Sequence, residues 1–152
     1  MTSMQAIQAE IIATYAAISL PNGLGTPTGY KHEPKGGFSE SDLPTVIVTR
    51  GVKITQVPLA SDHWQVTREW IAELYLYAIA DGDEVQDTER DNSGDCIDAV
   101  TEAFSPHGLK TSGVMFHNIT ADTDGTVLML RDTELQIIGV AFRHEVTYYQ
   151  FT

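Results

Sequence analysis

Residues 66–79 alternate between two kinds of side chain with almost no interruption. The even-numbered positions are mostly apolar, whereas the odd-numbered positions mix Thr, Glu, Ile and Tyr. Period-two alternation indicates a β-strand whose two faces meet different environments. At about 3.3 Å per residue the run would span roughly 46 Å, far beyond a usual strand of about 5–6 residues. Such a strand either bends between two sheets or reaches past the core of its own domain.

A second alternating run covers residues 137–151, with an apolar face from Ile138 to Tyr148 and a mixed face beside it. Mixed faces rich in tyrosine are common where protein meets protein, so we predict that the two runs supply a subunit interface. Cross-strand aromatic packing inside one sheet is the alternative, and it stays open here. The predicted interface residues are Glu69, Glu73, Tyr75, Tyr77, Arg143, Glu145 and Tyr149.

Two amphipathic helices are predicted, over residues 4–19 and 93–104. The first ends at Pro21, and the second could begin as early as Glu84. Both show apolar residues at helical spacing, which is typical of helices that cover one face of a sheet. The stripes are Ile7, Ile11, Tyr15 and Ile18 in the first helix, and Ile97, Val100 and Phe104 in the second.

Residues 21–42 hold five glycines and three prolines among many small polar residues. This composition predicts a long loop or flexible arm. Tyr30 and Phe38 are the exceptions, and both are candidate anchors that dock this arm on a neighbour.

The remaining segments predict shorter strands. Residues 45–49 and 52–57 flank Gly51 and form either a hairpin or a bent strand, while residues 114–119 and 127–131 flank a hairpin signal at Asp124-Gly125. The order helix, strands, helix, strands predicts one α+β domain over residues 1–152. Its sheet is mostly antiparallel and twisted and contains two long strands. One helix at the N-terminus and a second helix in the middle of the chain flank this sheet.

The acidic composition argues against nucleic-acid binding. Nine basic residues stand against 21 acidic ones, and the basic residues are scattered singly, whereas binding to phosphates needs clustered Lys and Arg. An acidic stretch follows the first long run, but a calcium loop starting at Asp81 would have Gln86 at its sixth and Asn92 at its twelfth position, which is the wrong pattern. We therefore expect a solvated acidic loop near a lumen or a partner face: Asp81, Asp83, Glu84, Asp87 and Asp91.

No pattern of residues predicts catalysis. The five histidines are dispersed, the single Cys96 lies on an apolar helical stripe, and no nucleophile elbow, phosphate-binding loop or dinucleotide motif occurs. No apolar run reaches the length of a membrane span. We therefore expect no enzyme, metal, cofactor or membrane association.

The order of elements resembles the tail terminator family of long-tailed bacteriophages. The features that carry the resemblance are the N-terminal helix, the Gly/Pro-rich loop, the strand after Leu43-Pro44, and the long strand with Arg68-x-Trp70. The central helix and the closing strand ending in Tyr148-Tyr149 complete the pattern. It covers nearly the whole chain as an arrangement of elements, and other head–tail joining proteins share much of it.

The resemblance implies a structural virion protein that forms a homohexameric ring. Such a ring caps the tail tube, ends its polymerisation and offers a surface to the head–tail connector protein. DNA would pass through the ring without specific binding, and assembly would take place in the host cytoplasm. Another connector or tail-completion protein is the alternative, followed by a small-ligand-binding α+β domain.

Overall fold

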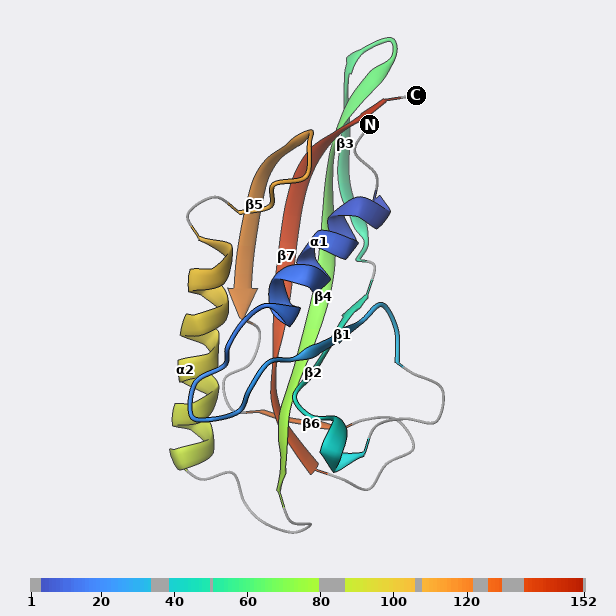
Figure 1. Ribbon diagram of the computed structural model, residues 1–152. Coiled ribbons are helices and arrows are strands. Elements are labelled where there is room, and N and C mark those ends of the chain that lie inside the picture. The colour runs from blue at the N-terminus through green and yellow to red at the C-terminus, as the bar shows by residue number, and fades with distance from the viewer. Residues whose placement is uncertain are drawn as a thin grey trace.

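The computed structural model describes residues 4–33, 39–49, 51–79, 87–105, 108–121, 126–129 and 136–151. Two α-helices lie on one face of a seven-stranded, mostly antiparallel sheet (Figure 1), which confirms the predicted α+β class. The elements in chain order are α1 (Met4–Ala16), β1 (Thr28–Tyr30), the short 3₁₀ helix Glu40–Asp42, β2 (Thr45–Thr49), β3 (Lys53–Ala60), β4 (His63–Ile79), α2 (Asp87–Phe104), β5 (Val114–Ala121), β6 (Thr126–Met129) and β7 (Gln136–Phe151).

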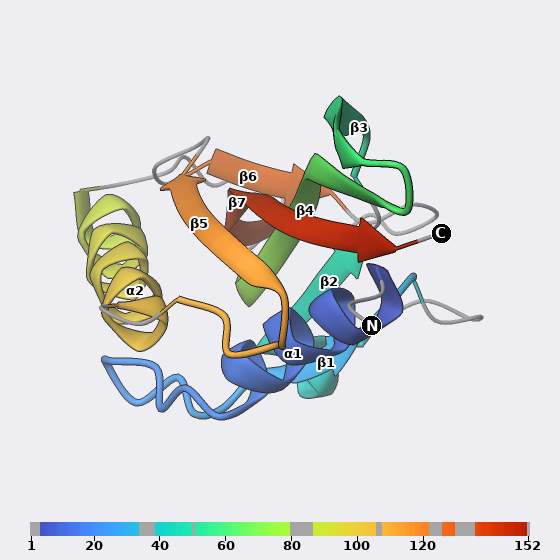
Figure 2. The ribbon, with the colours of Figure 1, turned by 90° about the horizontal axis from the view of Figure 1, so that it is seen from above.

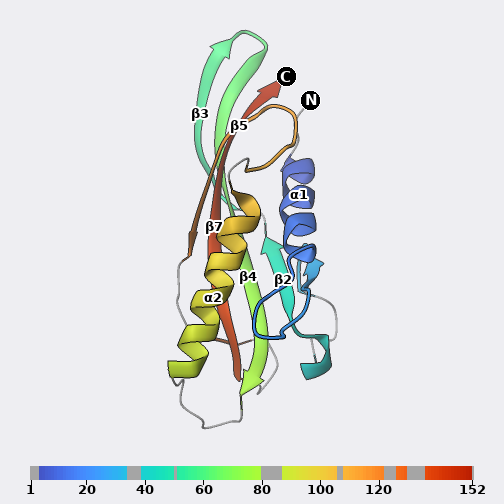
Figure 3. The same cartoon turned by 60° about the vertical axis from the view of Figure 1, so that its left-hand side comes forward.

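The two long strands pair with each other along almost their whole length. They run antiparallel from His63 opposite Phe151 to Ile79 opposite Gln136. β4 has 17 residues and β7 has 16, which confirms both predicted long strands. At about 3.3 Å per residue β4 is about 55 Å long. Figures 1 and 3 show both strands running from one end of the molecule to the other.

Each long strand carries two shorter strands, one after the other, along its outer edge. β2 and β3 both pair with β4, so the bent-strand alternative for this region is correct and the hairpin alternative is wrong. β5 and β6 likewise both pair with β7. The hairpin predicted around Asp124-Gly125 is therefore wrong in its pairing, because β5 and β6 follow one another along the same partner; the turn itself lies outside the described residues.

Gly51 marks the junction between β2 and β3. The neighbouring Val52 carbonyl accepts a hydrogen bond of 3.1 Å from the Glu69 amide of β4. An ideal Cβ on Gly51 would stand 0.8 Å from the Glu69 carbonyl oxygen. Only a residue without a side chain allows the two backbones to approach this closely.

The core lies between the helices and one face of the sheet, as Figure 2 shows from above. α1 presents Ile7, Ile11 and Tyr15 of the predicted stripe and ends at Ala16, so the buried Ile18 follows the helix instead of belonging to it. α2 presents Cys96, Val100 and Phe104, whereas the predicted Ile97 is only partly buried. The sheet contributes even-numbered residues of both long strands to this core, which confirms the predicted apolar face of β7. The fully buried residues of this layer include Val66, Trp70, Ala72, Leu74, Ile138, Val140, Phe142, His144, Val146 and Tyr148.

The described residues between 21 and 42, which are 21–33 and 39–42, are more structured than a flexible arm. The described part contains β1, which pairs in parallel with β2, and a bridge between Leu20 and Gly25. Tyr30 packs against a second small cluster on the far face of the sheet, formed by Ile47, Tyr75 and Ile137. The predicted anchor Tyr30 therefore docks on its own chain, whereas Phe38 lies outside the described residues.

Candidate functional site: an apolar end of the sheet

The described residues contain no group of three or more His, Cys, Asp or Glu side chains placed to hold a metal ion. Among the described helices, none is both long enough and apolar enough to cross a membrane.

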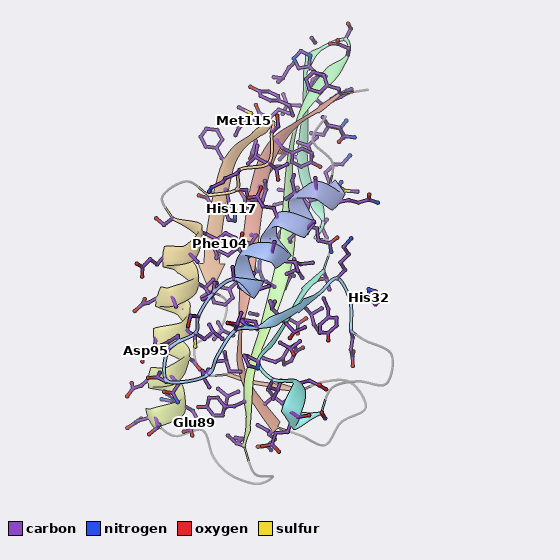
Figure 4. All side chains as sticks on the ribbon, viewed as in Figure 1. His32, Glu89, Asp95, Phe104, Met115 and His117 are labelled. Atoms are coloured by element: carbon purple, nitrogen blue, oxygen red, sulfur yellow. The ribbon has the colours of Figure 1, made fainter. Side chains whose placement is uncertain are left out.

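Leaving aside β6, whose side chains are not described, the large hydrophobic side chains that are exposed in the described ranges lie toward one end of the molecule. These residues come from β3 and the segment before it, from the start of β5 and from the end of β7. Figure 4 shows Met115 at this end, beyond the helices. We name the group the apolar end: Val52, Ile54, Val57, Leu59, Met115, Phe116 and Phe151, with exposed fractions of 36–76%.

Much of the apolar end sits on a projecting hairpin, which we name the hairpin arm (residues 52–65). β3 pairs with the first part of β4 here, and all eight residues of β3 are exposed. Figures 1 and 3 show the arm extending past the ends of both helices. Exposed large apolar side chains that gather in one region are a feature typical of interaction surfaces.

The outer edge of β3 is poorly suited to pairing with a further strand. Pro58 has no amide hydrogen, Lys53 places a charge on the edge, and two register shifts interrupt the pairing with β4. Proline, lysine and bulges are the features that protect edges from strand addition. A partner at this edge would therefore contact side chains of the arm and would not pair with its backbone.

The apolar end continues onto the sheet face opposite the helices. The His63 ring lies 5.5 Å from the Phe151 ring and 6.4 Å from the Tyr149 ring, measured between centroids. Next along the strands, Thr67 and Thr147 join their hydroxyl groups at 2.9 Å. The predicted interface residue Tyr149 thus lies beside the apolar end.

Charged side chains follow on the same face. Glu69 stands directly opposite Glu145, and an Arg143 Nη1 lies 3.9 Å from a Glu69 carboxylate oxygen. Like charges opposite each other on antiparallel strands are unfavourable. One arginine beside two carboxylates leaves this part of the face acidic, with Glu73 four residues after Glu69 along β4.

The two predicted interface tyrosines of β4 occupy different places. A register shift between Tyr75 and Tyr77 turns Tyr77 to the helix face, where its hydroxyl accepts a hydrogen bond of 3.2 Å from Asn92 of α2. The prediction that strict alternation places Tyr77 on the open face is therefore wrong. Tyr75 stays on the open face but is only 4% exposed, and its hydroxyl donates to Glu73 at 2.7 Å.

The predicted acidic loop is in part a helix. Asp87 and Asp91 belong to α2, which begins six residues before the predicted start, and both are exposed. Asp81, Asp83 and Glu84 lie outside the described residues. Figure 4 shows Glu89 and Asp95 along the same helix, so its outer side is acidic.

A buried polar chain joins three elements that the sequence does not connect. The Tyr15 hydroxyl lies 2.6 Å from His144 Nε2, and His144 Nδ1 lies 2.8 Å from His117 Nε2. If Tyr15 donates, both contacts are satisfied with neutral rings, since His144 then donates to His117. Burial lowers the pKa of His117 to about 4, and burial followed by the His117 charge lowers the pKa of His144.

The ring of Phe104 from α2 packs on both imidazoles, with centroid distances of 5.3 Å to His117 and 4.9 Å to His144. Sequence analysis missed this cluster because the histidines are 27 residues apart and lie on separate strands. Only the β5–β7 register brings them together. Through Tyr15 and the ring of Phe104, the chain holds α1 and α2 against the sheet.

A groove of about 840 Å³ lies between the second half of α1 and the end of α2. Four alanines contribute to its walls, and the Glu10 carboxylate stands at one side. That carboxylate accepts hydrogen bonds from the backbone amides of Lys110, at 2.6 Å, and Thr111. The groove therefore combines small apolar walls with a charge that is already hydrogen-bonded.

No protein-family profile matches this sequence, and no curated protein is significantly similar to it.

Proposed function

We propose that this chain is a structural virion protein that assembles as a ring, caps the phage tail tube and offers a surface for head attachment. The observation that carries the proposal is the apolar end, which includes a hairpin arm extending past the helices. The order of elements that resembles tail terminators supports it independently. The resemblance to tail terminators concerns the arrangement of helices and strands. The hairpin arm adds a physical reason for assembly, because it exposes apolar side chains.

The charge distribution favours a partner identical to this chain. The hairpin arm holds one lysine and one aspartate, which cancel, so the whole formal charge of −12 lies elsewhere. Strongly acidic copies repel one another except where they meet through neutral surface. The arm is such a surface, and it is also apolar.

A ring follows when the contact joins two different patches. A head-to-tail contact closes into a ring if its rotation completes a circle, and extends into a filament if it does not. The six-fold closure itself comes from the resemblance to tail terminators. Acidic side chains facing the channel would keep passing DNA from adhering.

The test combines solution mass with tube capping. We expect light scattering and electron microscopy to show rings, or to show them once tail tubes of the same phage are added. Leu59→Asp should weaken assembly, because Leu59 is 45% exposed and belongs to the apolar end. Thr120→Asp adds the same charge at an exposed position of β5 outside the apolar end and is the matched control.

A protein that stays monomeric alone and fails to bind either end of the tubes contradicts the proposal. Binding to the head connector without capping tubes would instead support the alternative, another head–tail connector protein.

A third candidate, a small-ligand-binding domain, is favoured by the groove between α1 and α2. A large thermal stabilisation by one metabolite would support that reading.

A further inference from the structure

We propose that the groove between α1 and α2 receives the hairpin arm of a neighbouring copy. This inference rests on the proposed function, because it names the surface to which the ring-forming arm binds. The arm and the groove lie on different parts of one molecule. Figures 1 and 3 show the arm pointing away from the ends of both helices, so a single copy does not fill its own groove.

The groove has the walls that a branched aliphatic side chain needs. Ala13 and Ala17 line it from α1, and Ala99 and Ala103 line it from α2. Three of these four alanines are exposed, whereas alanines on paired helices are usually covered. Small side chains leave the volume of about 840 Å³ open, which lies in the range of about 300–1,000 Å³ typical of binding sites.

The arm presents side chains of matching chemistry. Ile54, Val57 and Leu59 are 45–48% exposed on β3, an eight-residue strand that pairs with β4 and has all its residues exposed. Insertion of these side chains between the helices would remove apolar surface from water on both copies, at about 25 cal/mol per Å². Among the segments whose side-chain burial is described, which excludes β6, no other exposes a comparable series.

The charges around the groove tolerate a partner. Burying an unpaired carboxylate is costly, but Glu10 already accepts hydrogen bonds from two backbone amides and from the Thr111 hydroxyl. Glu102 and Lys110 are exposed at the rim, where their charged groups can remain in water. The neutral arm brings no excess charge into this acidic surrounding.

The resulting contact joins two different patches, the arm of one copy and the groove of the next. Contacts of this type leave one free arm and one free groove on every open chain of subunits. A closed ring uses all of them. The arm–groove contact is therefore compatible with a closed ring, in which every arm and every groove is occupied.

Disulfide trapping between two variants tests the contact directly. Leu59→Cys is mixed with Ala103→Cys under mild oxidation, with and without tail tubes, and we expect a disulfide-linked heterodimer. The control mixes Leu59→Cys with Thr120→Cys, an exposed position on β5 away from the groove. The native Cys96 does not interfere, because it is buried and burial raises the pKa of its thiol to about 11.

Filling the groove is the second test. Ala13→Phe places a ring in the groove, whereas Ala9→Phe places one on an exposed position of the same helix outside it. We expect Ala13→Phe to raise the concentration needed for half-assembly by about tenfold or more, and Ala9→Phe to leave it unchanged. Circular dichroism should show both variants folded.

The outcomes separate this inference from the proposed function. Rings or tube capping with no trapping at Ala103, or with equal effects of the two phenylalanine variants, overturn the groove and leave the ring proposal standing. Absence of rings, of tube capping and of trapping overturns both. Trapping at Ala103 together with loss of assembly in Ala13→Phe supports the contact.

Discussion

Replacing Tyr15 by phenylalanine removes a single hydroxyl group from the buried chain that it forms with His144 and His117. Tyr15 and His144 are both 0% exposed, so water cannot replace the lost partner. The phenylalanine ring keeps its place against Phe104 and Phe142, whose ring centroids lie 5.2 and 6.0 Å away. The change therefore isolates the hydrogen bond from the packing.

The expected loss follows from the pairing of His144. A net hydrogen bond contributes about 0.5–1.5 kcal/mol, and a buried acceptor left without a donor costs about 1–3 kcal/mol. His144 Nε2 has no other hydrogen-bond partner among the described residues. We expect Tyr15→Phe to lower the free energy of unfolding by about 1–3 kcal/mol, and Tm by roughly 2–4 °C for each kcal/mol.

Urea denaturation at pH 7.5 measures this loss. The protomer concentration must be the same for every variant, since assembly couples to stability. Tyr149→Phe is the control, because Tyr149 is half-buried on the open face, and we expect a change within about 0.5 kcal/mol. If Tyr15→Phe costs no more than this control, the hydroxyl does not stabilise the imidazole and the argument for the chain fails.

Three further predictions use the same denaturation assay. Acidification from pH 7 to 5 should lower the free energy of unfolding by about 1 kcal/mol or more. The pKa values of His117 and His144 are lowered in the folded state, so the unfolded state binds more protons in this pH range. A free energy of unfolding that does not change with pH would contradict this. Trp70→Ala should cost about 3–5 kcal/mol, since the side chain is 0% exposed, and a small loss would refute its place in the core. Gly51→Ala should cost about 1–3 kcal/mol or more, because its Cβ would meet the Glu69 carbonyl, and unchanged stability would show that β2 and β3 can separate from β4 there.

Local periodicity explains why much of the fold could be predicted. The alternation over β7 assigns each side chain to a face without knowledge of its partner strand, because successive Cβ atoms point to opposite sides. The stripe from Ile7 to Tyr15 likewise assigns the buried side of α1. Both assignments agree with the burial of these residues in the structure.

Features that depend on pairing could not be read in the same way. Tyr77 changes face because the β4–β7 register shifts by one residue beside it, and such a shift has no local signal. The Asp124-Gly125 pair is a strong hairpin signal, yet β5 and β6 each pair with β7 and not with one another. The exposure of Val57 and Leu59 on β3 could not be predicted either, because apolar residues in a strand are expected to be covered by other parts of the protein.

The α+β class, the two helices, the two long strands and the acidic balance follow from the order and spacing of neighbouring residues. Which residues meet across the sheet depends on the tertiary structure. It joined His117 to His144, gathered the exposed apolar residues at one end, and left a groove between α1 and α2. These arrangements depend on strand register and helix placement, which arise from contacts between residues distant in the chain.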